Sequence, residues 1–314
     1  MKYFVIGSGS IGHRHAKNLK ILGANITHYS WRKINLEKVL KDIRACNGKA
    51  AVVIATATNV RLSLILQCAA AGAALYIEKP IAFRLSDVSK IYALPNEILK
   101  RSVAGFMMRY HPIFQRVLKD KVDHIFRASF EIGHDVNQWR QNYIFSENYA
   151  SDRLGGGVLL DLCHEIDIAF LVCGPAKLVS VRSIQHPDFD EVDIASTLDF
   201  SDEKGLNYRI AMDYISPKLI RRGSIIGTDL QIDYDLVHNK FIKTSKESYK
   251  ENVLDYERNQ LFLDLMFDFM CLAEGRNAIN PYIPRLDRIR DVCNVIASAW
   301  ETREFTGKLR ANLK

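Results

Sequence analysis

Three glycines near the amino terminus have the spacing of a phosphate-binding loop. Gly7, Gly9 and Gly12 stand in the segment Gly-Ser-Gly-Ser-Ile-Gly, after the apolar run 3–6 and at the start of a helical pattern. Gly7 permits a tight turn, Gly9 lets the backbone approach a pyrophosphate, and Gly12 lets the helix pack closely on the strand. The helix start adds free N–H groups and a positive dipole end. We therefore expect a dinucleotide on Gly7, Gly9, Ser10, Ile11 and Gly12, rather than a turn with incidental glycines.

The residues after the second expected strand bear on the choice of cofactor. NAD-specific sites usually carry Asp or Glu about 20 residues beyond the glycine loop, where it binds the ribose 2′-hydroxyl. Residues 29–33 here are Tyr-Ser-Trp-Arg-Lys, without a carboxylate. Ser30 and Arg32 suit a 2′-phosphate by hydrogen bond and charge, so NADP(H) is favoured over NAD(H). The alternative is that Arg32 and Lys33 only begin a solvated helix and the site is indifferent to the phosphate.

A histidine and a lysine further along have the properties that an alcohol oxidation requires. Hydride transfer between a carbinol and a nicotinamide needs a group that exchanges the hydroxyl proton and a cation that stabilises the developing alkoxide. His164 suits the first task, since imidazole titrates near neutral pH. Lys79 follows an apolar strand, at the edge where open α/β sheets bind their ligands, and Asp161 lies three residues before His164. At that spacing the two share one helical face. The alternatives are a surface lysine and a buried structural histidine.

A parallel sheet would position the glycine loop and Lys79. Short apolar runs alternate with helical patterns over the first hundred or so residues. Expected strands cover 2–6, 25–29, 51–55, 74–77 and 101–106, and expected helices cover 11–22, 35–45, 60–71 and 85–94. Such alternation indicates βαβ units and a sheet covered on both faces. We predict a doubly wound α/β Rossmann domain over residues 1–118.

The pattern changes after about residue 122. A strand at 124–133, a polar aromatic loop and a glycine turn at 155–157 precede an expected helix at 158–172. Further strands are expected at 177–184, 194–200, 206–214, 219–227, 230–234 and 236–244, and helices at 255–274 and 285–303. Consecutive strands without intervening helices indicate a large open sheet, mixed but mainly antiparallel. Residues 119–314 are predicted to form a second α/β domain for substrate binding and oligomerisation, with the last helix returning to the first domain.

The composition excludes several classes of protein. With 314 residues, 48% of them hydrophobic and 25% charged, the chain has the profile of a two-domain globular protein. The net charge is +7, but acidic residues interrupt the basic ones, so no nucleic-acid partner is expected. No apolar run approaches the roughly 18 residues of a membrane span, and no signal peptide is evident, so we expect a cytoplasmic protein without membrane contact. Six scattered cysteines, without a Cys-x-x-Cys pair, predict neither disulfides nor a metal site.

Five motifs occur in order along most of the chain. They are Gly7-x-Gly9-x-x-Gly12-x-Arg14-His15, Ala55-Thr56 with Asn59, Glu78-Lys79-Pro80, Gly105-Phe106 with Arg109 and Pro112, and Gly155-Gly156-Gly157 followed by Asp161-Leu162-Cys163-His164-Glu165-Ile166-Asp167. Together they resemble the family of oxidoreductases that includes glucose-fructose oxidoreductase, inositol dehydrogenase and the rhizopine-catabolism proteins. The resemblance implies a homodimer or homotetramer formed through the sheet of the second domain.

The resemblance also implies roles for individual residues. The catalytic group would be Lys79, His164 and Asp161. Thr56, Asn59, Glu78 and Lys79 would add to the cofactor contacts. The substrate would be lined by Arg109, Tyr110, Arg140, Tyr143 and Asp167, the last of which is also placed to orient the imidazole.

Three features depart from the family pattern. The family commonly has its acid four residues before the histidine rather than three, which leaves the role of Asp161 as a substrate ligand open. A single helix is expected between the second and third strands, where the family usually carries two elements. Arg61 stands where a histidine is frequent, and we expect its side chain on the helix surface. Glu165 is expected to be a solvated or supporting carboxylate.

These observations predict an NAD(P)-dependent dehydrogenase or reductase that acts on a CH–OH group. The substrate class would be a sugar, a cyclitol or a nucleotide-linked sugar, because the variant around His164 resembles members that act on activated or acidic sugars in surface-polysaccharide biosynthesis. Three alternatives stay open: a dinucleotide-dependent glycosidase using transient oxidation, a non-catalytic NADP(H)-binding sensor, and a reductase of imines or tetrapyrroles. A sensor would need the glycine loop but not Lys79 and His164 together.

Overall fold

The structure is a computed structural model that describes residues 1–138 and 144–313. The chain divides into two units: unit 1 is Met1–Tyr110 with Glu257–Ala297, and unit 2 is His111–Tyr256 with Ser298–Lys314. The boundary falls after residue 110 rather than after residue 118, because helix α6 (Pro112–Asp120), which the sequence patterns did not reveal, packs on α8 (His164–Cys173) of unit 2.

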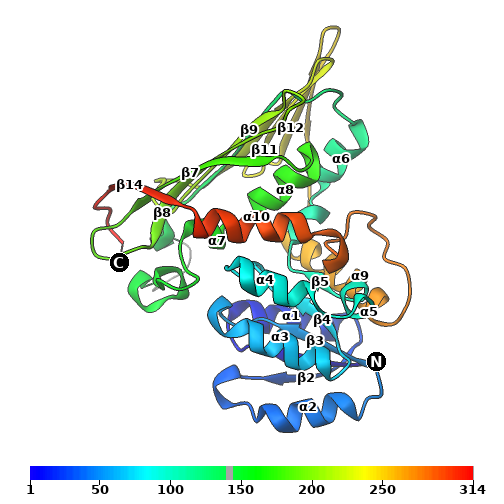
Figure 1. Ribbon diagram of the computed structural model, residues 1–314. Helices are drawn as coiled ribbons and strands as arrows, with labels where there is room; N and C mark the ends of the chain where they lie inside the picture. Colours follow the sequence, from blue (N-terminus) through cyan, green and yellow to red (C-terminus); the bar gives the residue numbers. More distant parts are fainter. Residues whose placement is uncertain (139–143, 314) are drawn as a thin grey trace. The chain divides into compact units, whose positions relative to one another are not determined.

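Unit 1 is a five-stranded parallel sheet with the order β2-β1-β3-β4-β5 (Figure 1). Its strands are β1 (Lys2–Ile6), β2 (Asn25–Tyr29), β3 (Ala50–Ile54), β4 (Ala74–Ile77) and β5 (Val103–Ala104). Its helices are α1 (Ser10–Ile21), α2 (Leu36–Arg44), α3 (Arg61–Ala70), α4 (Leu85–Tyr92), α5 (Asn96–Lys100), α9 (Arg258–Ala273) and most of α10 (Arg290–Glu301). The strand order reverses at β1, and the carboxyl ends beside that point are where such sheets bind ligands.

Both faces of this sheet are covered, which explains its apolar strands. Every residue of β3, Ala-Ala-Val-Val-Ile, is buried. Helix α3 packs against α2 and α4, whereas α1 packs against α9. The return of α9 is fixed by polar contacts as well: Asn259 and Asn18 exchange side-chain hydrogen bonds, and Tyr3 donates to Glu274 at 3.0 Å.

Unit 2 is built on a nine-stranded sheet with the order β13-β12-β11-β10-β6-β9-β8-β7-β14. Its strands are β6 (Arg127–Gly133), β7 (Lys177–Gln185), β8 (Asp193–Ser201), β9 (Asn207–Asp213), β10 (Ile220–Ile226), β11 (Leu230–Asp235), β12 (Lys240–Ser245), β13 (Tyr249–Val253) and β14 (Glu304–Lys308). Among the described strands of this sheet, only the pairs β6–β9 and β7–β14 are parallel. The predicted fold class, a Rossmann sheet plus a large mixed and mainly antiparallel sheet, is therefore confirmed.

One face of the large sheet carries the helices that bear the predicted catalytic residues. Helix α8 packs on β6 and β9, with α6 beside it (Figure 1). Tyr208, Ile210 and Met212 alternate inward along β9, as a sheet with one covered face requires. The helix expected over 158–172 is instead two helices, α7 (Val158–Asp161) and α8, separated by Leu162 and Cys163. Strands β13 and β14 were not predicted, since β13 is exposed throughout and β14 nearly so.

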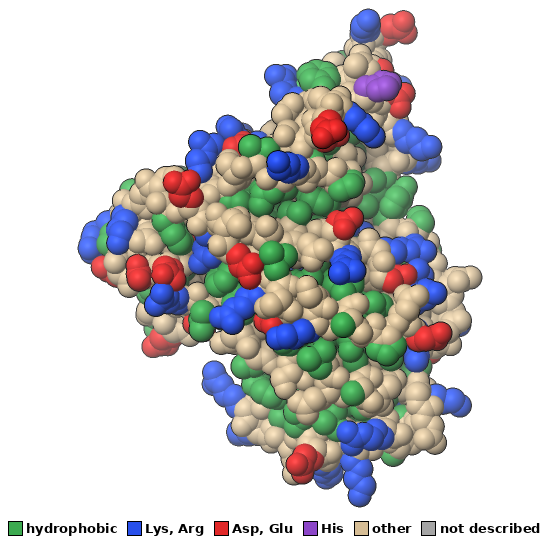
Figure 2. All heavy atoms as spheres, viewed as in Figure 1, with side chains coloured by type: hydrophobic (Ala, Val, Ile, Leu, Met, Phe, Trp, Pro, Cys, Tyr) green, Lys and Arg blue, Asp and Glu red, His purple; other side chains and the backbone are tan. Residues whose placement is uncertain are grey.

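The surface carries mixed charge. On the face seen in Figure 2, basic and acidic side chains are interspersed, and the residues drawn there form no continuous basic stripe. No helix in the described part of the chain is long and apolar enough to cross a membrane. Among residues 1–138 and 144–313, no three His, Cys, Asp or Glu side chains gather in a way that could hold a metal ion.

Candidate active site

The glycine loop is closed against the sheet on its inner side. Gly7 has φ +131°, and a Cβ there would lie 2.3 Å from the carbonyl oxygen of Ala55. A Cβ on Gly12 would lie 2.0 Å from the Gly7 carbonyl oxygen. Strand β2 holds the loop: the Gly7 amide donates to Tyr29 O at 3.0 Å, and His28 Nε2 donates to Gly7 O at 2.8 Å. Only glycine fits at positions 7 and 12.

The outer side of the same loop is open. Gly9 has φ −74° and ψ 176°, and no described atom lies within 4 Å of the position its Cβ would take. Gly9 is the N-cap of α1, and within the described chain no side chain caps this helix end and no acidic residue stands in its first turn. A helix leaves its first N–H groups without intrahelical partners and presents a positive dipole end there. Gly9, Ser10 and Ile11 therefore fit the pyrophosphate of a dinucleotide.

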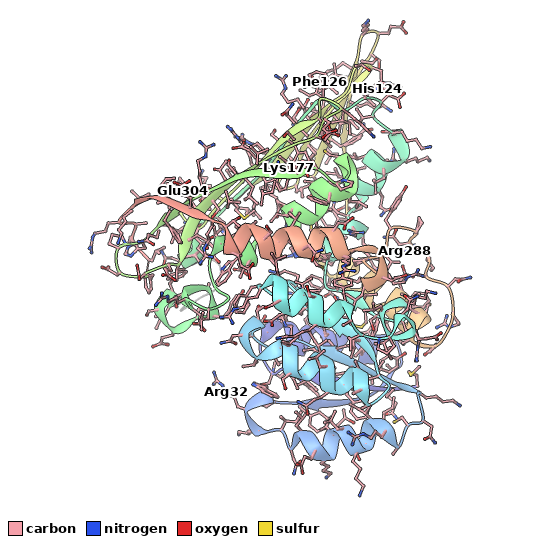
Figure 3. All side chains as sticks on the ribbon, in the orientation of Figure 1. Arg32, His124, Phe126, Lys177, Arg288 and Glu304 are labelled. Atoms are coloured by element: carbon pink, nitrogen blue, oxygen red, sulfur yellow. The ribbon has the colours of Figure 1, made fainter. Side chains whose placement is uncertain are left out.

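The end of β2 places Ser30 beside this loop. Ser8 Oγ donates to Ser30 Oγ at 3.0 Å. Arg32 lies in the one-turn 3₁₀ helix Trp31–Lys33, is exposed, and projects away from the sheet in Figure 3. The guanidinium is thus accessible to an anion next to Ser30.

The loops after β3 and β4 lie side by side at the carboxyl edge of the sheet, because Ile54 pairs with Ile77. Thr56 follows β3, and its buried Oγ1 accepts and donates no hydrogen bond within the described residues. Asn59 is exposed in the turn Thr58–Val60. Lys79 follows β4 and is half-buried. The predicted cofactor-side residues are thereby gathered at one edge with the glycine loop.

Glu78 is directed into the protein rather than toward solvent. His15 Nε2 lies 2.6 Å from its Oε1, and its Oε2 accepts from the Lys79 amide at 3.2 Å. Burial alone would raise the pKa of Glu78, but the hydrogen bond and charge of His15, together with Lys79 and Arg61, lower it. Glu78 thus connects α1 with the backbone of Lys79. A direct contact between Glu78 and the cofactor stays a prediction.

The prediction that the Arg61 side chain lies on the helix surface is wrong. The side chain is buried, with only 4% of its surface exposed. The guanidinium donates to three main-chain oxygens: Nη2 to Thr56 O at 2.5 Å, and Nη1 to Glu78 O at 2.5 Å and to Pro80 O. The sequence analysis missed this role because the partners are carbonyl groups, which every residue carries.

In unit 2, Asp161 ends α7 and His164 begins α8. Both side chains are buried, at 8% and 9% exposure. Tyr149 donates to Asp161 Oδ1 at 2.7 Å, and Tyr214 donates to Oδ2 at 3.2 Å. The prediction that Asp161 and His164 share one face of a continuous helix is wrong, because Leu162 leaves helical geometry at φ −102° and ψ 21°. The two tyrosines were not predicted.

The two other acidic residues of this segment are buried as well. Asp167 is fully buried. Glu165 is 5% exposed, and its Oε1 accepts from Arg221 Nε at 2.6 Å in an ion pair. Glu165 is therefore not solvated but a supporting carboxylate that ties α8 to β10.

The start of α7 is held by an aspartate from a neighbouring strand. Asp193, at the start of β8, is fully buried, and its Oδ2 accepts from the Leu159 amide at 2.8 Å and from Ser196 Oγ at 3.0 Å. A Cβ on Gly157 would lie 2.1 Å from its Oδ1, so the glycine turn makes room for this carboxylate. Burial raises the pKa of Asp193, although Arg303 opposes the shift. The sequence signal available was Asp193 itself, an acidic residue at the start of the alternating strand β8.

Arg109 and Tyr110 bind main-chain and side-chain groups within unit 1. Arg109 Nη1 donates to Tyr282 O at 3.2 Å, and Tyr110 donates to Asp268 Oδ2 at 2.7 Å. Burial, followed by the charge and hydrogen bond of Asp268, raises the pKa of Tyr110. Their predicted contact with substrate stays a prediction. Arg140 and Tyr143 lie outside the described residues.

The sequence is similar to those of inositol dehydrogenases. No family model matches the chain. It is 28% identical to myo-inositol 2-dehydrogenase of Thermotoga maritima over 197 residues, which is 55% of each chain. It is 26% identical to scyllo-inositol 2-dehydrogenase (NAD(+)) of Bacillus subtilis over 307 residues, 88% of this chain and 87% of that one. The chain thus spans about half the length of the first relative and most of the second.

Solved structures share the fold. Levoglucosan dehydrogenase in complex with NADH superposes with a TM-score of 0.75 at 15% identity, covering 96% of both chains. UDP-N-acetylglucosamine 3-dehydrogenase of Acidithiobacillus ferrooxidans superposes with a TM-score of 0.73 at 18% identity, again over 96% of both chains. The predicted family resemblance is confirmed. At these identities the solved structures establish the fold alone.

Proposed function

We propose that this protein is a nicotinamide-dinucleotide-dependent dehydrogenase or reductase that acts on a CH–OH group of a sugar or cyclitol. The observation that carries the proposal is the carboxyl edge of unit 1, where a glycine loop open at Gly9 adjoins the loops that bear Thr56 and Lys79. The names of the two inositol 2-dehydrogenases support a cyclitol or sugar alcohol. A nucleotide-linked sugar is the second substrate class, supported by one neighbour of the fold.

The chain's own residues account for the proton chemistry. A bound nicotinamide would accept or supply the hydride. In the oxidative direction, the imidazole of His164 takes the proton of the hydroxyl that is oxidised, and the ammonium of Lys79 donates a hydrogen bond to the same oxygen as negative charge develops there. Asp161 accepts one hydrogen bond on each oxygen from tyrosines, which holds the carboxylate in one orientation.

The proposed cofactor preference is NADP(H). The Bacillus relative is named for NAD(+), and the levoglucosan enzyme was solved with NADH. In this chain residues 29–33 contain no acid, and Ser30 and the exposed Arg32 follow β2. A carboxylate would repel a 2′-phosphate, whereas a guanidinium attracts it.

We also propose that the chain forms a homo-oligomer through the nine-stranded sheet. The face of β7 that does not meet the core combines an exposed Val179 with the charge pair Arg182–Asp199. Light scattering of the purified protein measures the assembly directly. A monomer at micromolar concentration would contradict it.

The function is tested by a cofactor-reduction screen across cyclitols, free sugars and nucleotide sugars, followed by a double-mutant cycle. His164→Ala should slow turnover by about 10²–10⁴, the range of a lost general acid or base, while cofactor binding stays intact. If Lys79 acts on the same step, the double variant should be slowed by far less than the product of the two single effects. His238→Ala, in an exposed hairpin, is the control. Full turnover in His164→Ala would contradict the assignment.

A further inference from the structure

Arg61 occupies a position that is unfavourable for a cation. It is the first residue of α3, and its guanidinium is buried near the positive end of that helix dipole. A buried charge persists only where polar groups compensate its lost hydration. The charge of the Glu78 carboxylate contributes to this compensation. The hydrogen bonds come from main-chain oxygens in two different loops, those of Thr56, Glu78 and Pro80.

Two of these three oxygens belong to the residues on either side of Lys79, a member of the proposed catalytic group. Glu78 and Pro80 flank Lys79, so a single Nη1 atom is bonded to the carbonyl before Lys79 and to the carbonyl after it. The Lys79 amide in turn donates to the Glu78 carboxylate, which His15 holds from α1. The backbone at Lys79 is thus fixed on both sides. The hydrogen bond from Arg61 to Thr56 O also ties this segment to the loop after β3.

We propose that Arg61 is a positioning residue, which sets the place of Lys79 relative to the loop after β3 by binding the main chain on either side of it. This inference rests on the function proposed for Lys79. A planar guanidinium presents several N–H donors in fixed directions, and this geometry spans three carbonyls in two loops. Lysine has one nitrogen and a shorter reach, so Arg61→Lys keeps the charge but loses the simultaneous bonds.

The test compares Arg61→Lys with Arg101→Lys. Arg101 also donates to two main-chain oxygens of unit 1, those of Gly48 and Ala273, but Gly48 lies before β3, at the opposite edge of the sheet from Lys79. Arg61→Lys should lower kcat about 10²-fold, the scale of a misplacement of about 1 Å, and change the cofactor KM by less than threefold. Arg101→Lys should retain its kcat. Equal losses of kcat in the two variants, or near-normal kcat in Arg61→Lys, would overturn the proposal.

Two further measurements separate this inference from the function on which it rests. Hydrogen–deuterium exchange needs no substrate: peptides covering residues 78–83 should exchange at least tenfold faster in Arg61→Lys and at the wild-type rate in Arg101→Lys. Unchanged exchange would refute the role of Arg61 even in an active enzyme, whereas an inactive wild type with the expected exchange would refute only the function. Added guanidinium ion should restore part of the kcat of Arg61→Ala, and urea should not. Equal recovery with urea would also count against the proposal.

Discussion

Two glycines of the same loop should respond differently to the addition of one methyl group. Gly12→Ala would place a Cβ 2.0 Å from Gly7 O, so helix α1 must move by about 1 Å to reach the 3.0 Å limit of observed contacts. Such overpacking typically costs about 1–3 kcal/mol. Gly9→Ala meets no described atom within 4 Å, and its φ of −74° suits any residue. Alanine restricts the unfolded chain more than glycine does, which stabilises by about 0.4–1 kcal/mol, but it is a poorer N-cap residue, which costs about as much. Gly9→Ala should therefore change the stability of the cofactor-free protein by less than about 1 kcal/mol.

For cofactor affinity we expect the opposite order, with Gly9→Ala the more damaging of the two substitutions. The methyl group of Gly9→Ala would occupy the space proposed for the pyrophosphate, so we expect Kd to rise at least tenfold, which is about 1.4 kcal/mol. Thermal unfolding without ligand and calorimetric titration with NADPH measure the two effects separately. Gly307→Ala, which also meets no described atom within 4 Å, is the control and should change neither. Wild-type affinity in a well-folded Gly9→Ala protein would refute the placement of the phosphates.

Four further substitutions test other parts of the structure. Burial lowers the pKa of His111 to about 3, from 6.5 in an unfolded chain, so below pH 6.5 the unfolded state binds more protons and stability falls. Protonation of His111 in the unfolded state should lower the free energy of unfolding by about 2 kcal/mol between pH 7.5 and 5. Urea unfolding at the two pH values should show this loss in the wild type and not in His111→Asn. Arg32→Ala should weaken NADPH binding about tenfold and leave NADH binding unchanged in calorimetry. Tyr149→Phe should lower kcat/KM about tenfold with little change in melting temperature, because its ring is exposed and its hydroxyl orients Asp161. Tyr214→Phe should instead cost about 1–3 kcal/mol of stability, since it removes a donor from a buried carboxylate oxygen.

The fold of unit 1 could be predicted from the sequence because its elements are locally determined. The strand at 2–6, the glycines that follow and the helix after them form one continuous pattern, and the structure has β1, the loop and α1 at those positions. Elements with weak or exposed patterns were missed. Strand β13 has no buried residue, and β14 depends on pairing with β7, more than a hundred residues earlier.

The candidate site could be predicted only where side-chain identity carries the role. The glycines, Lys79, Asp161 and His164 belong to recognisable motifs. Arg61 could not be placed in the same way, because its partners are the main-chain oxygens of Thr56, Glu78 and Pro80. A carbonyl leaves no mark in a sequence, and the helical pattern at 60–71 is equally compatible with an exposed or a buried first turn.

Helices α7 and α8 are interrupted between Asp161 and His164, so the three-residue spacing of this pair does not by itself exclude the roles proposed for them. Leu162 and Cys163 contain no glycine or proline, so the sequence offered no reason to end a helix there. The carboxylate of Asp161 is instead fixed by Tyr149 and Tyr214, which come from a loop and from the end of β9. Once a helix is interrupted between two residues, their relative direction no longer follows from the number of residues separating them. A spacing of three can then serve where four is usual, because tertiary hydrogen bonds rather than helical periodicity orient the acid.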